Sequence, residues 1–305
     1  MQTKKYLSVD RQNKVVVTGG AGFIGSNLVD ALVDKGYKVS VIDNLSNGKK
    51  EFVNKKAKFY KADITNPKAL KPIFKGAVYV FHLAALPRVE YSIKYPKESH
   101  EVNITGTLNV LIAARDAGVK KVIYSASSSA YGDQLVMPLV ETMEAHPKSP
   151  YALHKHAGEL YCRLFSEVYG LPTVSLRYFN VYGNRQSAEG AYALVIAKFF
   201  EQKRKGLPMT ITGDGKQTRD FTNVRDVVSA NILAAESEIK NGEVFNIGAG
   251  RNYSVNEVAK FIGGAIKHIP ARLEPHEMLA DNSKARKILG WIPQVKFEDG
   301  IEELK

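Results

Sequence analysis

The stretch VVVTGGAGFIGSNLVDAL, from Val15 to Leu32, changes its pattern in the middle. It begins with β-branched residues, as a buried strand does, and ends with apolar side chains at helical spacing. Glycines occupy positions 19, 20, 22 and 25. A strand that runs through a glycine-rich turn into a helix brings peptide N–H groups and the positive helix end close to an anion. We therefore expect Gly19, Gly22 and Gly25 to bind the pyrophosphate of a dinucleotide.

The alternation of strand and helix continues through the first half of the chain. Strands are expected at 14–18, 38–43, 58–63, 78–85 and 121–127, and helices at 23–35, 66–75 and 98–117. Strands that alternate with helices are typical of βαβ units, which form a parallel sheet covered on both faces. The sequence therefore predicts an α/β fold with a Rossmann-type doubly wound parallel sheet.

The second half of the chain is less regular. After a strand end at 175–183, helices are expected near 193–204, 224–236 and 282–289, with strands at 209–212 and 243–248. We expect an N-terminal extension over 1–13, an NAD-binding Rossmann domain over 14–178, and a smaller C-terminal α/β substrate lobe over 179–305. The lobes are expected to interleave, with the site in the cleft between them.

Composition restricts the class of protein. With 44% hydrophobic and 24% charged residues, the 305-residue chain resembles an ordinary globular protein. It has no run of eighteen apolar residues, so no membrane span is expected. The single cysteine, Cys162, favours a reducing cytoplasm. The net charge of +12 comes from scattered lysines, which favours an anionic small substrate over nucleic acid. No metal site is predicted.

Two acidic residues strengthen the dinucleotide interpretation. Asp43 closes the second expected strand, eighteen residues after Gly25. A carboxylate at this place accepts hydrogen bonds from the ribose diol and repels a 2′-phosphate, so NAD is favoured over NADP. Asp63, at the end of the third strand, is expected at the adenine edge.

The candidate chemical centre is a tyrosine–lysine pair. Tyr151 and Lys155 open a helix just after Pro150, and their spacing places both on one helical face. A nearby lysine and an oxidised nicotinamide both favour the phenolate, which would take a proton from a sugar hydroxyl. Ser127, at the carboxyl end of the fifth strand, is expected to hydrogen-bond the reacting oxygen and to relay its proton to Tyr151.

These residues belong to a longer ordered set of motifs. The chain resembles the extended short-chain dehydrogenase/reductase family, and within it the UDP-hexose 4-epimerases of the UDP-galactose and UDP-N-acetylglucosamine type. The likeness extends from Lys14 to about residue 300, and it rests on TGGAGFIG, DNLSNG, ADI, HLAA, VNITGTLNVL, SSSAYG, YALHK, RYFNVYG, GDGKQTRDF, FNIGAG and ADNSKARKILGW.

The resemblance implies roles for individual residues. The catalytic set would be Ser127, Tyr151 and Lys155, with Ser128 and Ser129 as adjacent alternatives for the serine and as substrate-binding residues. Asn103 would support the helix beside the cofactor, and Tyr178 would lie near the nicotinamide. NAD would be bound by Gly19, Gly22, Phe23, Ile24, Gly25, Asp43, Asn44, Ser46, Gly48, Asp63, Ile64, Leu83, Ala84, Ala85, Asn103, Tyr151, Lys155 and Tyr178.

The resemblance also implies a UDP-sugar substrate and a homodimer. Met278 would gate the 2-substituent of the sugar, and the dimer would form a four-helix bundle from residues 98–117 and 152–168 of each copy. The nucleotide diphosphate and its ribose would be held by Asn180, Arg219, Arg272 and Glu274. Paired arginines suit a pyrophosphate in charge and geometry.

Several reactions begin with hydride removal from C4 of the sugar. A nucleotide-sugar 4,6-dehydratase then expels water, for which relatives carry an acidic residue beside the catalytic hydroxyl, whereas this chain has Ser128 and Ser129. Hydroxyl groups suit the simplest cycle, in which C4 is oxidised, the keto-sugar rotates, and hydride returns to the other face. The resemblance thus favours a 4-epimerase with retained NAD. The alternatives are a dehydratase or C4 reductase, and a dinucleotide-binding protein without catalytic activity.

Overall fold

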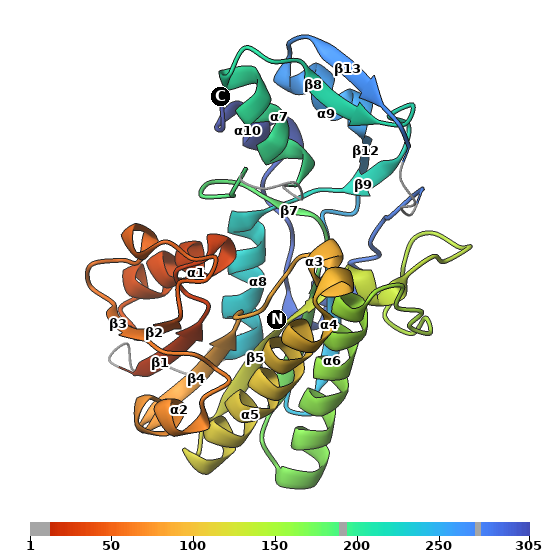
Figure 1. Cartoon of the computed structure of the whole chain (residues 1–305). Coiled ribbons are helices and arrows are strands. Elements are labelled where there is room, and N and C mark those ends of the chain that lie inside the picture. The colour runs from red at the N-terminus through yellow and green to blue at the C-terminus, as the bar shows by residue number, and fades with distance from the viewer. Residues whose placement is uncertain (1–12, 189–193, 272–275) are drawn as a thin grey trace, which may run out of the picture.

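Two lobes of unequal size make up the molecule (Figure 1). The computed structural model describes residues 13–188, 194–271 and 276–305. The larger lobe contains the sheet and the helices around it, and the smaller lobe holds the C-terminus (Figure 1). Most of the expected extension over 1–13 lies outside the described residues.

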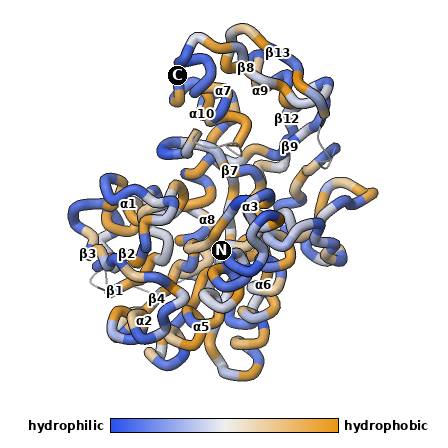
Figure 2. The backbone as a smooth tube through the Cα atoms, viewed as in Figure 1, coloured by the Kyte–Doolittle hydropathy of each residue, from blue (hydrophilic) through white to orange (hydrophobic). Residues whose placement is uncertain are grey.

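A seven-stranded parallel sheet forms the centre of the larger lobe, in the order β11-β6-β5-β4-β1-β2-β3. This arrangement confirms the predicted doubly wound fold. Its central strands are mostly buried and rich in apolar residues, as expected for strands covered on both faces (Figure 2). The strands are β1 (Lys14–Thr18), β2 (Lys38–Asp43), β3 (Lys58–Lys61), β4 (Ala77–His82), β5 (Lys121–Ser127), β6 (Thr173–Tyr178) and β11 (Glu243–Ile247).

Helices cover both faces of this sheet. One face packs against α1 (Phe23–Asp34) and α8 (Val224–Glu236), and the other against α2 (Pro67–Phe74), α5 (Gly106–Asp116) and α6 (Pro150–Tyr169). Successive residues of a strand point to opposite faces of the sheet. In β1, Val15 and Val17 lie in the apolar core beneath α1 and α8, and Val16 lies in the core beneath α2, α5 and α6. The carboxyl ends of the strands are thereby held at one edge, toward the smaller lobe (Figure 1).

The expected helix at 98–117 is divided in the structure. It consists of α4 (Pro96–His100), a π-helical turn (Glu101–Thr105) and α5, with the short helix α3 (Val89–Lys94) before it. The Thr107 hydroxyl donates a 2.7 Å hydrogen bond to the Asn103 carbonyl oxygen within this stretch. Such back-bonding competes with the regular helical ladder and accounts for the local irregularity.

Two expected strands end early. β3 ends at Lys61 because the Asp63 carboxylate accepts from the Thr65 N–H and hydroxyl and turns the chain. β4 ends at His82, and the backbone beyond it bonds to the side chains of Thr18 and Asn103. The residues that follow both strands are thus in loops at the carboxyl edge of the sheet.

The smaller lobe has its own apolar core, which includes Phe199, Met209, Val258 and Phe297. Its helices are α7 (Val195–Arg204), α9 (Val255–Ile262) and α10 (Phe297–Glu302). Three two-stranded sheets complete the described fold. Their strands are β7 (Val181–Tyr182), β8 (Met209–Thr212), β9 (Thr218–Asp220), β10 (Thr222–Asn223), β12 (Asn252–Ser254) and β13 (Ile266–Ile269).

The chain passes between the lobes more than once. After β10 it returns to the larger lobe, where α8 covers the sheet and β11 pairs with β6. It crosses again near the end, where the expected helix at 282–289 is largely a π-helical turn (Ala285–Leu289). The Trp291 indole N–H then donates to the Asp226 carbonyl oxygen of α8 at 2.9 Å. Residues 224–247, within the range expected for the substrate lobe, therefore pack with the sheet of the larger lobe.

Candidate functional site

The glycine turn after β1 is tightly packed. Gly19 has a φ of +71°, a conformation that favours glycine, and a Cβ added there would lie 2.6 Å from the Ala84 nitrogen. A Cβ on Gly25 would overlap the Gly19 carbonyl oxygen. The absence of side chains at these positions thus lets the turn touch both the loop after β4 and the start of α1.

The start of α1 suits an anion. Gly22 occupies the N-cap position and provides no side chain to cap the helix. The first intrahelical bond runs from the Ser26 N–H to the Gly22 carbonyl oxygen, so the N–H groups of Phe23, Ile24 and Gly25 have no intrahelical acceptor. Donors at a positive helix end, beside a turn without side chains, fit the pyrophosphate of NAD.

Asp43 is held at the end of β2 by two backbone donors. The Ala21 N–H donates to Oδ2 at 3.0 Å, and the Leu45 N–H donates to Oδ1 at 2.8 Å. The side chain is buried, and each carboxylate oxygen keeps a second lone pair. The carboxylate therefore fits a ribose diol bound above the glycine turn.

The loop after β2 closes over the same turn. A Cβ on Gly48 would lie 2.9 Å from the Ala21 carbonyl carbon, and the Ser46 N–H donates to Asn44 Oδ1 at 2.9 Å. Asn44 Nδ2 in turn donates to the Asp63 carboxylate at 2.7 Å. Partial burial alone would raise the pKa of Asp63, but hydrogen bonds from Thr65 and Asn44 hold it below its usual value. Asp63 therefore joins the loops after β2 and β3.

The loop after β4 is fixed by Asn103. Its Oδ1 accepts the Leu86 N–H at 2.8 Å, and its Nδ2 donates to the Leu86 carbonyl oxygen at 3.1 Å. This clamp holds the backbone of Leu83, Ala84 and Ala85 beside the glycine turn. Ile64 lies behind it, where a Cβ on Gly106 would meet its Cδ1 at 2.6 Å. Asn103 is thus a positioning residue for this loop.

A buried histidine that sequence reasoning missed links the same elements. His82 contacts the Thr18 hydroxyl through Nδ1 at 2.7 Å and the Thr107 hydroxyl through Nε2 at 2.9 Å. Burial, together with the nearby Lys155, lowers the pKa of His82 to about 3, so the ring stays neutral. The only sequence signal for His82 was its place at the start of the motif HLAA.

The candidate catalytic residues meet at the end of β5 and the start of α6. Ser149 caps α6 by accepting the Ala152 N–H at 3.2 Å, which fixes the first helical turn. Tyr151 lies in that turn, beside the Ser127 side chain. Its own N–H donates to the Ser92 hydroxyl at 3.0 Å. The structure thus brings together the tyrosine and the serine that the sequence singled out.

Lys155 lies one turn further along α6. Its Nζ donates a 2.6 Å hydrogen bond to the Ser125 carbonyl oxygen and lies 5.0 Å from the centre of the Tyr124 ring. Burial lowers the pKa of Lys155 to about 8. Burial also raises the pKa of Tyr151, and the hydrogen bond with Ser127 opposes this change. The phenol therefore needs a nearby positive charge to act as a base.

Other predicted residues surround this centre. Ser129 donates to Ser127 through its backbone N–H at 3.2 Å and its hydroxyl at 2.9 Å, and Ser128 is buried. Tyr178 ends β6, where its hydroxyl donates to Asn231 Oδ1 at 3.0 Å. Burial raises the pKa of Tyr178 to about 12. Its hydroxyl is therefore a structural donor in the core, and its place beside the nicotinamide stays a prediction.

The predicted substrate residues are only partly described. Asn180 Nδ2 donates to the Asp220 carbonyl oxygen at 3.4 Å, and Arg219 donates to the Thr218 carbonyl oxygen at 2.8 Å. Met278 is buried in an apolar cluster with Tyr131, Leu139, Phe179 and Ala280. Arg272 and Glu274 lie outside the described residues.

Known proteins are similar to this chain over most of its length. The profile of the NAD dependent epimerase/dehydratase family matches residues 15–248. The chain belongs to this family. It is 39% identical over 299 residues to a putative UDP-glucose 4-epimerase of Methanocaldococcus jannaschii, with 95% of this chain and 96% of the relative covered.

Solved structures of the family are closely similar. The UDP-N-acetylglucosamine 4-epimerase of Methanobrevibacter ruminantium, in complex with UDP-N-acetylmuramic acid, is 41% identical with a TM-score of 0.92, and 96% of each chain is covered. The UDP-glucose 4-epimerase of Thermotoga maritima, with UDP-glucose, is 42% identical with a TM-score of 0.91, and 95% of this chain and 96% of that chain are covered.

A second residue that sequence reasoning missed organises the smaller-lobe side of this family member. Asp220 is fully buried and accepts from the N–H groups of Ala249, Gly250 and Ala280 at 2.7, 2.9 and 3.2 Å. Burial raises the pKa of Asp220 to about 6, against these hydrogen bonds. Through these hydrogen bonds Asp220 connects the loop after β11 to the segment that carries Met278. The only sequence signal for Asp220 was its place inside GDGKQTRDF.

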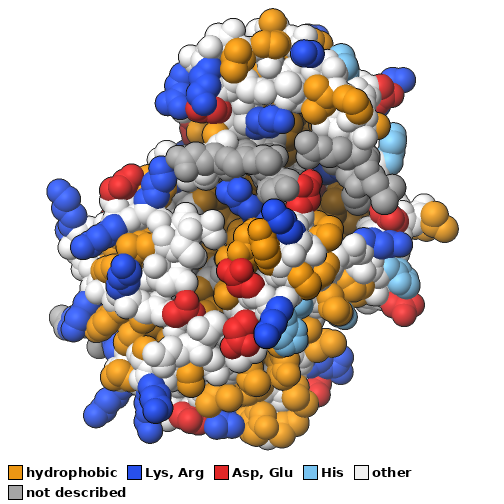
Figure 3. Space-filling view, viewed as in Figure 1, with side chains coloured by type: hydrophobic (Ala, Val, Ile, Leu, Met, Phe, Trp, Pro, Cys, Tyr) orange, Lys and Arg blue, Asp and Glu red, His pale blue; other side chains and the backbone are white. Residues whose placement is uncertain are grey.

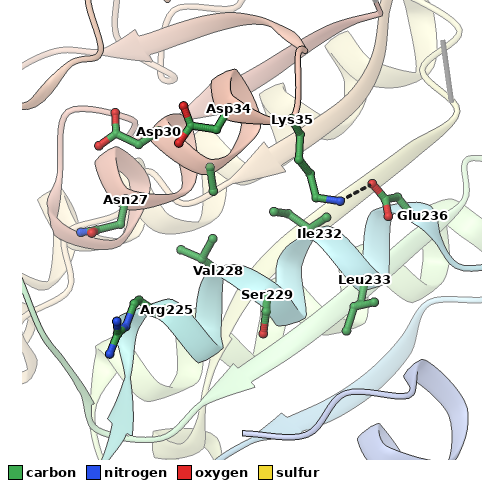
Figure 4. A pocket seen from close by; sticks show the side chains of 11 residues that line it. Asn27, Asp30, Asp34, Lys35, Arg225, Val228, Ser229, Ile232, Leu233 and Glu236 are labelled. Atoms are coloured by element: carbon green, nitrogen blue, oxygen red, sulfur yellow. Dashed lines mark hydrogen bonds and ion pairs between the residues drawn. The ribbon is translucent and has the colours of Figure 1, made fainter. Parts of the chain in front are cut away.

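A separate pocket of about 660 Å³ lies between α1 and α8 (Figure 4). Its lining includes Asp30, Ile232, Leu233 and Glu236, and it contains none of the predicted site residues.

No helix in the part of the chain that the structure describes is long and apolar enough to cross a membrane. The same residues contain no cluster of His, Cys, Asp and Glu side chains that would hold a metal ion.

Proposed function

We propose that this protein is an NAD-dependent 4-epimerase of UDP-hexoses. It would interconvert UDP-galactose and UDP-glucose, and we extend the proposal to the N-acetylated pair as a second substrate class. The observation that carries the proposal is the meeting of Ser127, Tyr151 and buried Lys155 at the carboxyl end of β5, in a fold whose first strand ends in an NAD-type glycine turn. The relatives and solved neighbours of the family support the same activity.

Tyr151 would act as the base and then as the acid. Its phenolate takes the proton from the sugar O4 hydroxyl while the hydrogen on C4 leaves as hydride, and a C4=O bond forms. NAD, when bound, supplies the hydride acceptor and donor. After the keto-sugar turns its other face to the cofactor, hydride returns to C4 and Tyr151 returns the proton to O4. The reaction balances without added reductant.

Lys155 and Ser127 would make this proton transfer possible. The Lys155 ammonium uses one donor on the Ser125 carbonyl oxygen, and its charge stabilises the phenolate of Tyr151. Ser127 lies beside Tyr151 and would hydrogen-bond both its phenol and O4, which would shorten the path of the proton. Ser128 and Ser129 provide no carboxyl group beside O4, so nothing in this turn favours expulsion of water from C5 and C6.

We assign the cofactor to the carboxyl edge of the sheet. The glycine turn and the start of α1 would hold the pyrophosphate, and Asp43 would accept from the adenosine ribose. Asn44, Ser46 and Asp63 would line the adenine side. Lys155 and Tyr151 would face the nicotinamide ribose.

The nucleotide-sugar would lie between the lobes. Asn180 lies between β6 and β7, Arg219 lies in β9, and Arg219 would bind the diphosphate. Met278 would meet the 2-substituent of the sugar from its apolar cluster beside Tyr131. A thioether side chain is flexible enough to repack around substituents of different size.

We also propose a homodimer through α5 and α6. Leu153, Leu160, Leu164 and Val168 form an exposed stripe along α6, with side chains 53%, 54%, 44% and 62% exposed. Hydrophobic side chains gather over α5 and α6 (Figure 3). A second copy that packs the same helices would bury this stripe in a four-helix bundle.

The buried free thiol of Cys162 suits a cytoplasmic protein.

Product analysis tests the proposed function. The protein is incubated separately with UDP-galactose, UDP-glucose, UDP-N-acetylglucosamine and UDP-N-acetylgalactosamine without added cofactor, and the products are separated by chromatography. Interconversion within a pair supports the epimerase and retained NAD. If neither pair interconverts even when NAD is supplied, the proposed function fails.

A further inference from the structure

The turn that carries Ser127 ends in a residue with no assigned role. After Ser127 the chain forms a 3-10 turn, Ser128–Tyr131, and the side chain of Tyr131 is fully buried. The Tyr131 ring lies 4.5 Å from the guanidinium carbon of Arg177. Arg177 is paired through two hydrogen bonds, of 2.9 and 2.7 Å, with Glu159 of α6. The turn is therefore anchored to the catalytic helix on one side.

The Tyr131 hydroxyl is also bonded to β11. It donates a 2.7 Å hydrogen bond to Asn246 Oδ1. Asn246 is fully buried, and its Nδ2 donates to the carbonyl oxygens of Leu139 and Asp281 at 2.9 and 3.3 Å. The Asn246 side-chain oxygen thus accepts a hydrogen bond from the turn that follows Ser127. Its NH₂ group donates to two segments of the chain near Met278.

Those two segments are bonded to each other. The Leu139 N–H donates to the Leu279 carbonyl oxygen at 2.7 Å, and the Asp281 N–H donates to the Leu139 carbonyl oxygen at 2.9 Å. In the same place, Tyr131, Leu139 and Met278 share one apolar cluster. A continuous chain of buried contacts therefore runs from Ser127 through Tyr131 and Asn246 to the segment 278–281.

We propose that Tyr131 is a positioning residue that holds the turn of Ser127 in register with the segment 278–281. The inference rests on the proposed function, in which that segment meets the sugar and Ser127 and Tyr151 act on its O4 hydroxyl. Proton and hydride transfer both depend on the place of C4 relative to these groups, and a small displacement lowers turnover steeply. The diphosphate and NAD are held by other residues, so their binding does not depend on Tyr131.

The test compares two buried tyrosines. Tyr131→Phe removes the hydroxyl and leaves Asn246 Oδ1 without its donor. The matched control is Tyr182→Phe, since Tyr182 is also buried but its hydroxyl contacts the Phe297 carbonyl oxygen in the smaller lobe, at 3.5 Å. We expect Tyr131→Phe to lower kcat about tenfold, with the inhibition constant for UDP and the bound NAD unchanged within about twofold. We expect Tyr182→Phe to keep the kcat of the original protein.

A double-mutant cycle with Asn246→Ala adds a second readout. If Tyr131 acts through Asn246, the double variant has the kcat of Asn246→Ala alone, whereas independent effects would multiply. An unchanged kcat in Tyr131→Phe, equal losses in both tyrosine variants, a parallel loss of UDP binding, or multiplied effects in the double variant would each overturn the inference. An original protein inactive on all four UDP-sugars would instead overturn the proposed function.

Discussion

The ammonium group of Lys155 lies 2.6 Å from the carbonyl oxygen of Ser125. This hydrogen bond joins α6 to the end of β5, two residues before Ser127. Because Tyr151 stands one turn earlier on the same helix, the bond fixes the tyrosine, the lysine and the serine relative to one another. The sheet therefore holds the three candidate catalytic residues in fixed positions relative to one another.

Replacing Tyr151 by phenylalanine removes the proposed base and keeps the ring. We expect Tyr151→Phe to retain NAD and to lower turnover by about three orders of magnitude or more, because proton transfer alone is lost. Chromatography of the UDP-sugars measures turnover, and absorbance of released cofactor measures NAD. Near-native turnover in this variant would show that another group is the base.

Asp43 is expected to select the cofactor. In Asp43→Ala the ribose loses its acceptor and the turn loses two backbone contacts, so we expect NAD affinity to fall about ten- to a hundredfold. The same change removes repulsion of a 2′-phosphate, so the preference for NAD over NADP should shrink. Titrations with both cofactors measure this, with Asp34→Ala, at an exposed position at the end of α1, as the control. An unchanged preference would contradict the role of Asp43.

The buried pair of Arg177 and Glu159 is expected to be essential for stability. Both side chains are almost fully buried, so Arg177→Met leaves the Glu159 carboxylate with only His156, at 3.3 Å, and should cost about 3–5 kcal/mol in the free energy of unfolding. Replacing both with apolar residues should cost less than the sum of the single changes. The exposed pair of Arg163 and Glu167 on the same helix is the control, where Arg163→Met should change nothing measurable.

Asp220 should give the folded protein a pH dependence of its own. Its pKa is raised from 3.8 to about 6, so the folded state binds this proton more tightly than the unfolded state. Protonation of Asp220 therefore adds about 2–3 kcal/mol to the free energy of unfolding. This contribution is fully present below pH 3.8 and is lost as the pH rises through 6. Unfolding curves between these pH values measure it. The difference in stability between the original protein and Asp220→Asn should change over this window, and a constant difference would contradict the shift.

The exposed stripe of α6 should control the oligomeric state. A charge placed in a bundle interface is costly, so Leu160→Glu and Leu164→Glu should convert the dimer into monomers at micromolar concentration. Leu207→Glu is the matched control, because Leu207 is equally exposed but lies in the smaller lobe. Light scattering after gel filtration gives the masses. A monomeric original protein, or dimers in every variant, would rule out this interface.

Local patterns in the sequence predicted most of the architecture. The strand, turn and helix around Gly19 follow from residues that are neighbours in the chain, and so does the start of α6 after Ser149 and Pro150. The parallel sheet and the family are confirmed. The roles of individual residues in binding NAD and sugar stay predictions.

The polar networks were beyond local patterns. Tyr131 and Asn246 are separated by 115 residues, and His82 and Thr18 by 64. Such pairs form only when the sheet brings distant strand ends together, and no periodicity in the sequence marks them. The buried Asp220 escaped for the same reason, since its donors lie 29 to 60 residues away. These long-range contacts determine the geometry of the site, whereas local sequence motifs indicate only where along the chain its residues lie.

The fate of the hydrogen on C4 tests the proposed reaction most directly. UDP-galactose labelled with deuterium at C4 is incubated with the protein, without added cofactor, and the product is analysed by mass spectrometry and NMR. We predict UDP-glucose with the deuterium retained at C4, because hydride returns to the carbon that it left. Deuterium moved to C6 with loss of water, or exchanged into solvent, would contradict the 4-epimerase.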